Sequence, residues 1–320
     1  MNLQELRTDL AFLFDPEQEI GLSMYFILEG ENGAEVKQAD ITAEVRTTLR
    51  DQFINYIRTT FHDNDELHFT DISSADTRRN AAYFFDLDEK PDGLQVLQDL
   101  LEDENADFFD FNNDEFDNIS GFVFLLGNEN NKLALYKKQY PINLLKRGAI
   151  LRLFPAGTRL DELKQDVLAI SNKVDFVQVD DGLIIMNVQT LERFFGFEDV
   201  IKSQAQISLG VIDDAGFLAD IESLQELATS LPSARKLMRV KADSPVLQLP
   251  FEHVRDFIKQ HPKLKKRIRF NADETQIALD TKVSKQLFLK LLDDDYLKSE
   301  LTQFNYDSEI KSRLSEEEAE

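Results

Sequence analysis

The residues that could hold a calcium ion lie in the acidic segment 110–121. Asp110, Asn112 and Asp114 have the spacing of the first ligands in a calcium-binding loop. Such a loop also needs a glycine at its sixth position and a bidentate glutamate at its twelfth, where this chain has Glu115 and Gly121. The segment is therefore better interpreted as a solvated acidic loop than as a calcium site.

The triplet Glu35-Val36-Lys37 has the order of the E-x-K element found in metal-dependent nucleases. Catalysis of that kind needs a further carboxylate to help hold Mg²⁺, and the sequence does not place one. A triplet of this type is also expected by chance in a chain that is 30 % charged. A metal-dependent nuclease therefore stays an open alternative rather than the main interpretation.

Other catalytic signatures do not occur in the sequence. The four histidines, His62, His68, His253 and His261, do not form an H-E-x-x-H pattern. There is also no G-x-S-x-G segment, no Walker A loop and no dinucleotide-binding fingerprint. We assign no catalytic residue, metal ligand or cofactor, and we favour a function other than catalysis while leaving an enzyme open.

Two basic segments stand out in a chain with 60 acidic residues, 36 basic residues and a net charge of −24. Residues 132–159 contain seven basic residues and no acidic one, and residues 235–269 contain eleven basic and three acidic residues. Most lysines and arginines are solvated surface, but a surface that lies on phosphates has a specific reason to exclude carboxylates, which would repel the DNA backbone. The predicted DNA-binding residues are Lys137, Lys138, Lys146, Arg147, Arg152, Arg235, Lys236, Arg239, Lys241, Lys265, Lys266 and Arg267. Tyr136 and Tyr140 lie among the first lysines, where they could stack or donate to phosphate.

The elements that must position these residues can be read from hydrophobic periodicity and turn residues. Strand-like runs around loops predict hairpins over 122–138 and 174–188, and residues 267–279 are expected to form a two-stranded ribbon. Apolar spacing predicts helices over 41–61, 159–171, 189–205 and 287–301. The expected fold class is α+β, with two lobes of mixed sheets and packed helices, and with C-terminal helices plus a β-ribbon.

The charge distribution suggests where the lobes divide. Residues 1–130 have a charge balance of −22, whereas residues 131–320 have a balance of −2. We therefore expect an acidic N-terminal α/β lobe over 1–120, a C-terminal lobe with the basic segments over 121–312, and an acidic tail over 313–320.

The composition also indicates a cellular compartment. The chain has no cysteine, which fits a reducing environment, and its first residues lack the basic region of a signal peptide. No apolar run approaches the roughly 20 residues of a membrane span. The expected location is the cytoplasm.

Three segments of the sequence resemble a known protein family. They are NKLALYKKQYPINLLKRG (131–148), SARKLMRVKADSPVLQLP (233–250) and LFLKLLDDDYLKSELT (287–302). Together they are similar to the KwaB family, the soluble B subunits of the Kiwa anti-phage defence system. The resemblance extends over nearly the whole chain and is clearest from about residue 120 onward.

The resemblance implies a function and two partners, DNA and the membrane protein KwaA. It implies a DNA-binding effector that acts against phage DNA and associates peripherally with the inner membrane through KwaA. We expect it to bind without marked sequence preference, because nothing in the sequence suggests a base-reading recognition helix, and so to block phage DNA replication or expression. It carries over no catalytic residue. The alternatives are the nuclease and an adaptor whose basic segments bind acidic protein or lipid headgroups. A homodimer or higher oligomer is expected, because closed symmetric dimers are the commonest soluble assembly.

Overall fold

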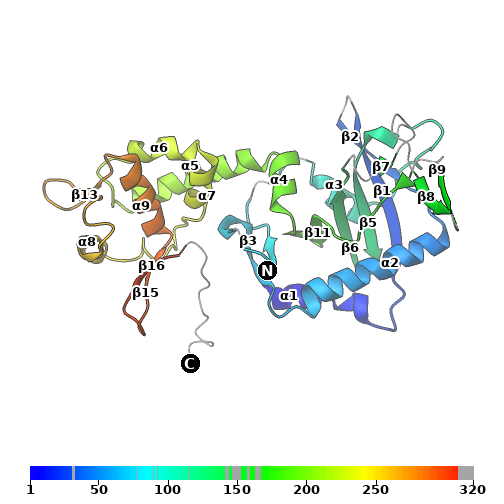
Figure 1. The fold of residues 1–320 in the computed structure, drawn as a ribbon, viewed down its shortest axis with the longest axis horizontal. Coiled ribbons are helices and arrows are strands. Elements are labelled where there is room, and N and C mark those ends of the chain that lie inside the picture. The colour runs from blue at the N-terminus through cyan, green and yellow to red at the C-terminus, as the bar shows by residue number, and fades with distance from the viewer. Residues whose placement is uncertain are drawn as a thin grey trace. The chain divides into compact units, whose positions relative to one another are not determined.

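The fold is known from a computed structural model that describes residues 1–30, 33–76, 78–88, 90–91, 93–114, 116–140, 144–145, 153–156, 159–162 and 167–308. Contacts between Cα atoms divide the chain into two compact units. Unit 1 comprises Met1–Thr70, Asn80–Phe85 and Asp92–Phe195, and unit 2 comprises Asp71–Arg79, Asp86–Pro91 and Gly196–Glu320. Figure 1 labels the elements of both units.

Unit 1 is built on an eight-stranded sheet. Its strands lie in the order β2 (Gly33–Gln38), β1 (Gly21–Gly30), β5 (Ile119–Gly127), β6 (Lys132–Lys138), β11 (Phe176–Val179), β12 (Gly182–Ile185), β4 (Ala81–Phe84) and β3 (His68–Asp71). Neighbours from β2 to β4 pair antiparallel. The hairpins predicted over 122–138 and 174–188 are confirmed as β5–β6 and β11–β12.

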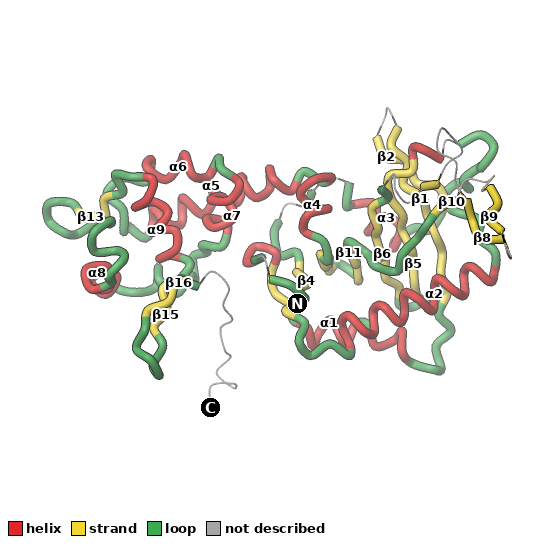
Figure 2. The backbone as a smooth tube through the Cα atoms, viewed as in Figure 1, coloured by secondary structure: helices red, strands yellow, loops and turns green. Residues whose placement is uncertain are grey.

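Both faces of this sheet are covered, because successive side chains of a strand point to opposite sides and both sets here are apolar. On one face, α1 (Leu3–Asp9) and α2 (Ala43–Ile57) pack over the sheet, and Phe53 of α2 meets Phe124 of β5 with ring centroids 4.5 Å apart. On the other face lie α3 (Gln95–Glu102) and α4 (Val188–Phe194), followed by Phe195, whose ring packs edge-on against Tyr136 and Phe176. Figure 2 shows the strands between these helices. The central strands therefore belong to the core of unit 1, and the polar residues on them are largely shielded from solvent.

The predicted helix over 159–171 is wrong. The chain instead forms the short strands β9 (Arg159–Glu162), paired with β8 (Leu153–Ala156), and β10 (Val167–Leu168), paired with β7 (Leu144–Leu145). The apolar spacing suggested a helix, but strand pairing with segments upstream in the chain overrides such a local preference.

Unit 2 is mainly helical. Its helices are α5 (Phe197–Asp214), α6 (Glu222–Ala228), α7 (Leu231–Met238), α8 (Phe251–Gln260) and α9 (Lys282–Leu292). Apolar side chains of these helices, such as Leu237 and Phe288, are fully buried. The predicted ribbon is confirmed as β13 (Arg269–Phe270) paired with β14 (Ile277–Ala278).

The predicted terminal helix over 287–301 ends early. It stops at Leu292, and β15 (Tyr296–Lys298) and β16 (Asn305–Asp307) follow as an antiparallel hairpin. Asp294 has a φ of 55°, in the left-handed region that does not continue a right-handed helix. This turn ends the helix and reverses the chain into the hairpin.

The α+β fold class is confirmed by these helices and sheets. Residue 120, where the charge balance suggested a division, falls inside β5 of the unit 1 sheet. The compact units divide instead near Phe195 and Gly196, with two short segments of unit 2 inserted earlier in the sequence. Charge describes the surface, whereas the units are defined by packing, so the two divisions need not coincide.

Candidate nucleic-acid interface

Lys137 and Lys138 lie on β6, inside the sheet of unit 1. The Lys138 residue is only 8 % exposed, and its Nζ lies 3.3 Å from Glu29 Oε1 and 4.6 Å from the centre of the Phe194 ring. Lys137 Nζ donates to the carbonyl of Lys173 at 2.7 Å, and burial lowers the pKa of Lys137. Both ammonium groups therefore already have partners within the chain.

Lys138 is buried because β6 is an interior strand with both faces covered, and Lys137 on the same strand is partly buried. Contact of these two lysines with phosphate stays a prediction. Tyr136 is also buried, and its ring stacks on Phe176 with centroids 5.2 Å apart. Tyr140 is more exposed, and its hydroxyl lies 3.3 Å from Thr190 Oγ1. Lys137 and Lys138 thus lie at the end of β6, where their side chains contact neighbouring segments of unit 1. Lys146, Arg147 and Arg152 lie outside the described residues.

Asp175 fixes the end of β6. Its carboxylate accepts hydrogen bonds from the Lys138 backbone N–H at 2.8 Å, from Asn187 Nδ2 at 2.7 Å and from Thr190 Oγ1 at 3.0 Å. Asp175 is buried, and buried carboxylates are tolerated when several donors satisfy them. This network joins β6 to the start of α4, and it is structural.

Arg239 and Lys241 are engaged in ion pairs within unit 2. Arg239 Nη1 lies 2.8 Å from Asp293 Oδ2, and its Nη2 donates to the carbonyl of Ala75 at 2.8 Å. Lys241 Nζ lies 2.8 Å from Asp86 Oδ2. Burial alone would lower the pKa of Lys241, but the hydrogen bond and charge of Asp86 outweigh it, so that pKa is raised. Both cations are thus paired with carboxylates of the same unit.

Arg235 and Lys236 lie in the last turn of α7, a few residues before Arg239. Both residues are partly buried, and each has interactions within the chain. Their placement makes them at most flanking contributors to a binding surface.

Lys265, Lys266 and Arg267 form an exposed basic turn, the name used for these three residues from here on. They follow α8, which ends before His261 and Pro262. Backbone N–H groups of Lys265 and Arg267 donate to the carbonyls of His261 and Leu264, so the segment coils as a short helical turn.

The basic turn projects outward because its apolar neighbours point inward. Leu264 is fully buried and Ile268 is 4 % exposed. Residues four apart in a helical turn share a face, so the three residues between Leu264 and Ile268 occupy the remaining faces. The structure thus presents three cations together on the surface of unit 2.

The residues around the basic turn are also basic but are partly neutralised. Lys263 pairs with Asp307, and Lys259 Nζ lies 2.5 Å from Glu274 Oε2. Arg269 has an 81 % exposed side chain, and its Nη1 is 3.8 Å from Asp280 Oδ2. The residues of the turn itself are therefore the strongest candidates for phosphate contacts among the described residues, and Arg269 extends them. Arg269 is not among the residues predicted from the sequence, although its position two residues beyond the turn in the same acid-free run could have indicated it.

The candidate metal-binding residues have partners inside unit 1. Lys37 Nζ lies 2.6 Å from Asp114 Oδ1 and 3.6 Å from Glu35 Oε1. The hydrogen bond from Lys37 lowers the pKa of Asp114, while Asp110 accepts from the backbone of Asn112 at 2.9 Å. Within the described part of the chain, no three histidine, aspartate or glutamate residues are arranged to hold a metal ion. The lysine of the E-x-K triplet is thus paired with Glu35 of that triplet and with Asp114 of the candidate calcium loop.

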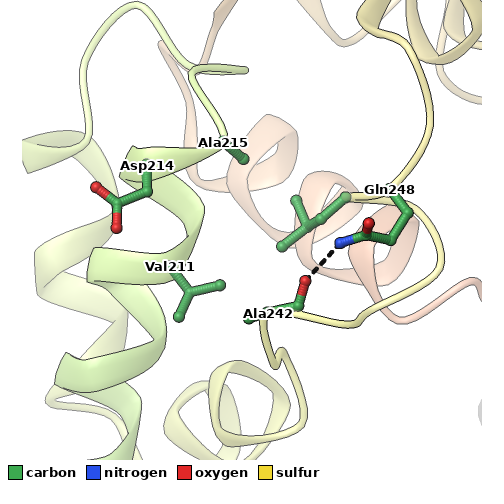
Figure 3. A pocket seen from close by; sticks show the side chains of 6 residues that line it. Val211, Asp214, Ala215, Ala242 and Gln248 are labelled. Atoms are coloured by element: carbon green, nitrogen blue, oxygen red, sulfur yellow. Dashed lines mark hydrogen bonds between the residues drawn. The ribbon is translucent and has the colours of Figure 1, made fainter.

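A hollow of about 250 Å³ in unit 2 offers little to a polar ligand. It is lined by Val211, Asp214, Ala215, Ala242, Leu247 and Gln248. Figure 3 shows Gln248 donating to the carbonyl of Ala242, at 2.6 Å, and the carboxylate of Asp214 turned away from that pair. Because its charged group does not point inward, the hollow is not our candidate site.

Comparison with known proteins gives the family of the chain. The model of the "Kiwa protein KwaB-like" family matches residues 116–302. The chain belongs to the KwaB-like family. A relative named "Kiwa protein KwaB", from Escherichia coli O55:H7 (strain RM12579 / EPEC), is 28 % identical over 320 residues, which cover 99 % of this chain and 100 % of that protein. No solved structure matches the chain.

Membership in the KwaB-like family indicates a component of a Kiwa anti-phage defence system. The matched range includes the hairpin β5–β6, helices α5 to α9 of unit 2 and the basic turn. Among the described helices of this KwaB-like chain, none is long and apolar enough to cross a membrane.

His261, just before the basic turn, gives this KwaB-like chain a predicted pH dependence. Burial and the charge of Lys263 lower the pKa of His261 in the folded chain. The unfolded chain therefore binds the proton more readily, and stability present at neutral pH should fall as the pH drops below the unfolded value of about 6.5. We expect the thermal midpoint of unit 2, followed by circular dichroism, to decrease between about pH 7.5 and pH 5.5.

The variant His261→Phe should lose this part of the decrease, whereas substitution of the exposed His253 by Phe should retain it. An equal pH dependence in the His261 variant and the unmodified chain would show that other groups cause the effect.

Proposed function

We propose that this chain is a DNA-binding effector of its Kiwa system, holding DNA by its phosphates without marked sequence preference and so blocking phage DNA replication or expression. The observation that carries the proposal is the basic turn, where Lys265, Lys266 and Arg267 are exposed together while nearby lysines are paired with carboxylates. Cations that are not already neutralised can replace the counterions of DNA, and release of those counterions drives nonspecific binding.

Contact with the backbone is the expected mode because of where the cations lie. They occupy a short turn between α8 and β13, and sequence-specific proteins commonly place a helix or ribbon in the major groove instead. Lysine and arginine on a turn can reach phosphates without reading base edges. Arg235 and Lys236 of unit 2 remain predicted DNA contacts, as do Lys146, Arg147 and Arg152, which lie outside the described residues.

We propose that the membrane partner is KwaA, and that this chain is cytoplasmic and meets the inner membrane through it. The acidic balance of −22 over residues 1–130 supports this, because cytoplasmic loops of membrane proteins carry excess lysine and arginine. A homodimer is the simplest assembly, and two basic turns on one particle would bind DNA more tightly than one.

Fluorescence anisotropy with labelled duplexes of unrelated sequence tests the proposal. We expect similar affinities for all sequences and a steep decrease in affinity with salt, since each phosphate contact contributes about −0.9 to the log–log slope. The same duplexes incubated with Mg²⁺ or Mn²⁺, with and without a chelator, test the nuclease alternative. Absence of binding at about 0.15 M salt would reject DNA binding and leave the adaptor alternative. Chelator-sensitive cleavage would establish the nuclease instead.

A further inference from the structure

The β15–β16 hairpin of unit 2 has a polar face. In the register of its two strands, Tyr296 pairs with Asp307, and Lys298 pairs with Asn305. Because successive side chains of a strand point to opposite sides, these two pairs share one face of the hairpin, and the pair between them points to the other face. Figure 1 shows the hairpin projecting beyond the helices of unit 2. The polar face therefore runs outward from its base at Tyr296 and Asp307 to Lys298 and Asn305.

The base of this polar face is fixed to the segment that precedes the basic turn. Tyr296 is buried, and the centre of its ring lies 4.8 Å from that of His261. Asp307 forms an ion pair with Lys263, and its Oδ1 lies 2.8 Å from Lys290 Nζ. Burial alone would raise the pKa of Asp307, but the hydrogen bonds and charges of the two lysines outweigh it, so that pKa is lowered. These contacts supply the packing that a two-stranded hairpin needs in water.

Lys298 and Asn305 are available to a ligand. Both residues are exposed, and within the part of the chain that the structure describes neither side chain has a hydrogen-bond or ion-pair partner. Residues directly opposite each other on antiparallel strands have Cβ atoms about 4.5–5.5 Å apart, so Lys298 Nζ and Asn305 Nδ2 can donate to the same anion. Lysine and asparagine are both among the side chains that donate to DNA phosphates. The pair thus has the chemistry of a phosphate site.

The ion pair between Lys263 and Asp307 places these two donors near the basic turn. Lys265 follows Lys263 by two residues, and Asn305 precedes Asp307 by two, so each Cα lies within about 8 Å of a residue of that ion pair. A DNA duplex carries one phosphate about every 3.4 Å of axis on each strand. One duplex can therefore present phosphates to the turn and to the hairpin together.

We propose that Lys298 and Asn305 form a second phosphate-binding site, on the polar face of the hairpin, that contacts the DNA backbone beside the phosphates held by the basic turn. This inference rests on the proposed DNA-binding function and adds two contact residues to it. DNA suits the arrangement better than an acidic protein does. A duplex carries a charge about every 1.7 Å of axis, whereas successive side chains of an extended protein segment are about 3.3 Å apart and alternate in direction.

The two residues should respond differently to substitution, and anisotropy titrations of a labelled duplex at several salt concentrations test this in the full-length chain. Lys298→Ala should bind the duplex about eightfold more weakly at 0.1 M salt, with a log–log slope shallower by about 0.9, because one counterion-releasing contact is lost. Asn305→Ala should bind about threefold to fivefold more weakly with an unchanged slope, because a neutral amide donates a hydrogen bond but releases no counterion.

Three further variants serve as controls. Leu297→Gln changes the neighbouring residue on the other face of the same strand and should leave affinity and slope unchanged. Lys202→Ala of α5 removes the same charge from unit 2 and should also bind normally, since Lys202 Nζ lies 3.7 Å from Asp199 Oδ1 and is already paired. Lys298→Gln removes the charge but retains a long polar side chain, and it replaces Lys298→Ala if thermal unfolding shows that the alanine variant is destabilised.

Each other result has a definite meaning. If Lys298→Ala leaves affinity and slope unchanged while Lys265→Glu with Lys266→Glu weakens binding, this inference is overturned and the proposed function stands. Equal weakening by Leu297→Gln would assign the effect to the fold of the hairpin and likewise overturn the inference. If Lys298→Ala weakens binding of a labelled polyglutamate but not of DNA, the site belongs to an acidic protein instead. Absence of DNA binding by the unmodified chain would overturn both the inference and the proposed function.

Discussion

Replacing Lys265 and Lys266 by glutamate is expected to weaken duplex DNA binding by about sixtyfold at 0.1 M salt. Each phosphate contact contributes about −0.9 to the slope of log affinity against log salt, so at 0.1 M salt one contact is worth about eightfold. Losing two contacts should also make the slope shallower by about two units. The loss should be the same for every DNA sequence, and it can be measured by anisotropy titrations at several salt concentrations.

A control variant with the same change in net charge is Arg46→Glu with Arg193→Glu, two exposed arginines of unit 1 outside the predicted surface. It should bind DNA almost as the unmodified chain does. Equal weakening by the two double variants would mean that net charge alone governs binding, and the basic turn would then lose its assigned role. Both variants should fold, because exposed substitutions usually change stability by less than about 0.5 kcal/mol.

Replacing Asp175 by alanine is expected to destabilise unit 1 by about 3–5 kcal/mol. The substitution leaves the Lys138 backbone N–H, Asn187 Nδ2 and Thr190 Oγ1 without their acceptor, and each buried donor that stays unsatisfied costs about 1–3 kcal/mol. Water can replace the lost acceptor for some of these donors, so the expected destabilisation is smaller than the sum of the three individual costs. This loss is a large fraction of the 5–15 kcal/mol that holds a typical domain folded.

Urea unfolding followed by circular dichroism, with hydrogen exchange of the β6 amides, measures the effect of Asp175→Ala. Glu129→Ala, in the exposed loop between β5 and β6, is the control and should change stability by less than about 0.5 kcal/mol. Unchanged protection of the β6 amides in Asp175→Ala would contradict a structural role for this carboxylate. The buried Lys138 has a related consequence: Lys138→Glu should also lower stability, so a loss of DNA binding in that variant would not identify a phosphate contact.

Much of the fold could be predicted because local signals and tertiary structure agree. The loop between β5 and β6, with asparagine and glycine at its ends, and the Asp180-Asp181-Gly182 turn between β11 and β12 indicated both hairpins. The prediction of a helix over 159–171 is wrong because the apolar spacing there is equally compatible with short strands, whose pairing partners lie elsewhere in the chain. The hairpin after α9 was missed because the change of direction depends on one left-handed aspartate, Asp294.

The candidate site could be predicted only in part, because a sequence shows charge but not burial. Lys137 and Lys138 look the same as Lys265 and Lys266 in the sequence, yet the first pair lies on an interior strand and the second on an outward turn. The carboxylates that neutralise Arg239 and Lys241 are 54 and 155 residues away along the chain. No local rule could have assigned those partners. The two pairs of lysines differ in the apolar residues beside them. A continuous run of buried strand residues precedes Lys137, whereas one buried residue on each side, Leu264 and Ile268, borders the basic turn.

The ion pair between Asp86 and Lys241 has a consequence for biosynthesis. Asp86 belongs to one of the two short segments of unit 2 that precede most of unit 1 in the chain, and its partner is made 155 residues later. At about 5–20 residues per second, a ribosome needs roughly 8–30 s to reach Lys241, and for that time the nascent segment lacks its permanent neighbours. Neither unit is a continuous stretch of chain, so truncation at any single position leaves at least one of them incomplete. Fragments that end before Phe195 leave both units incomplete, and we expect them to be substrates for chaperones and proteases rather than independently folded pieces.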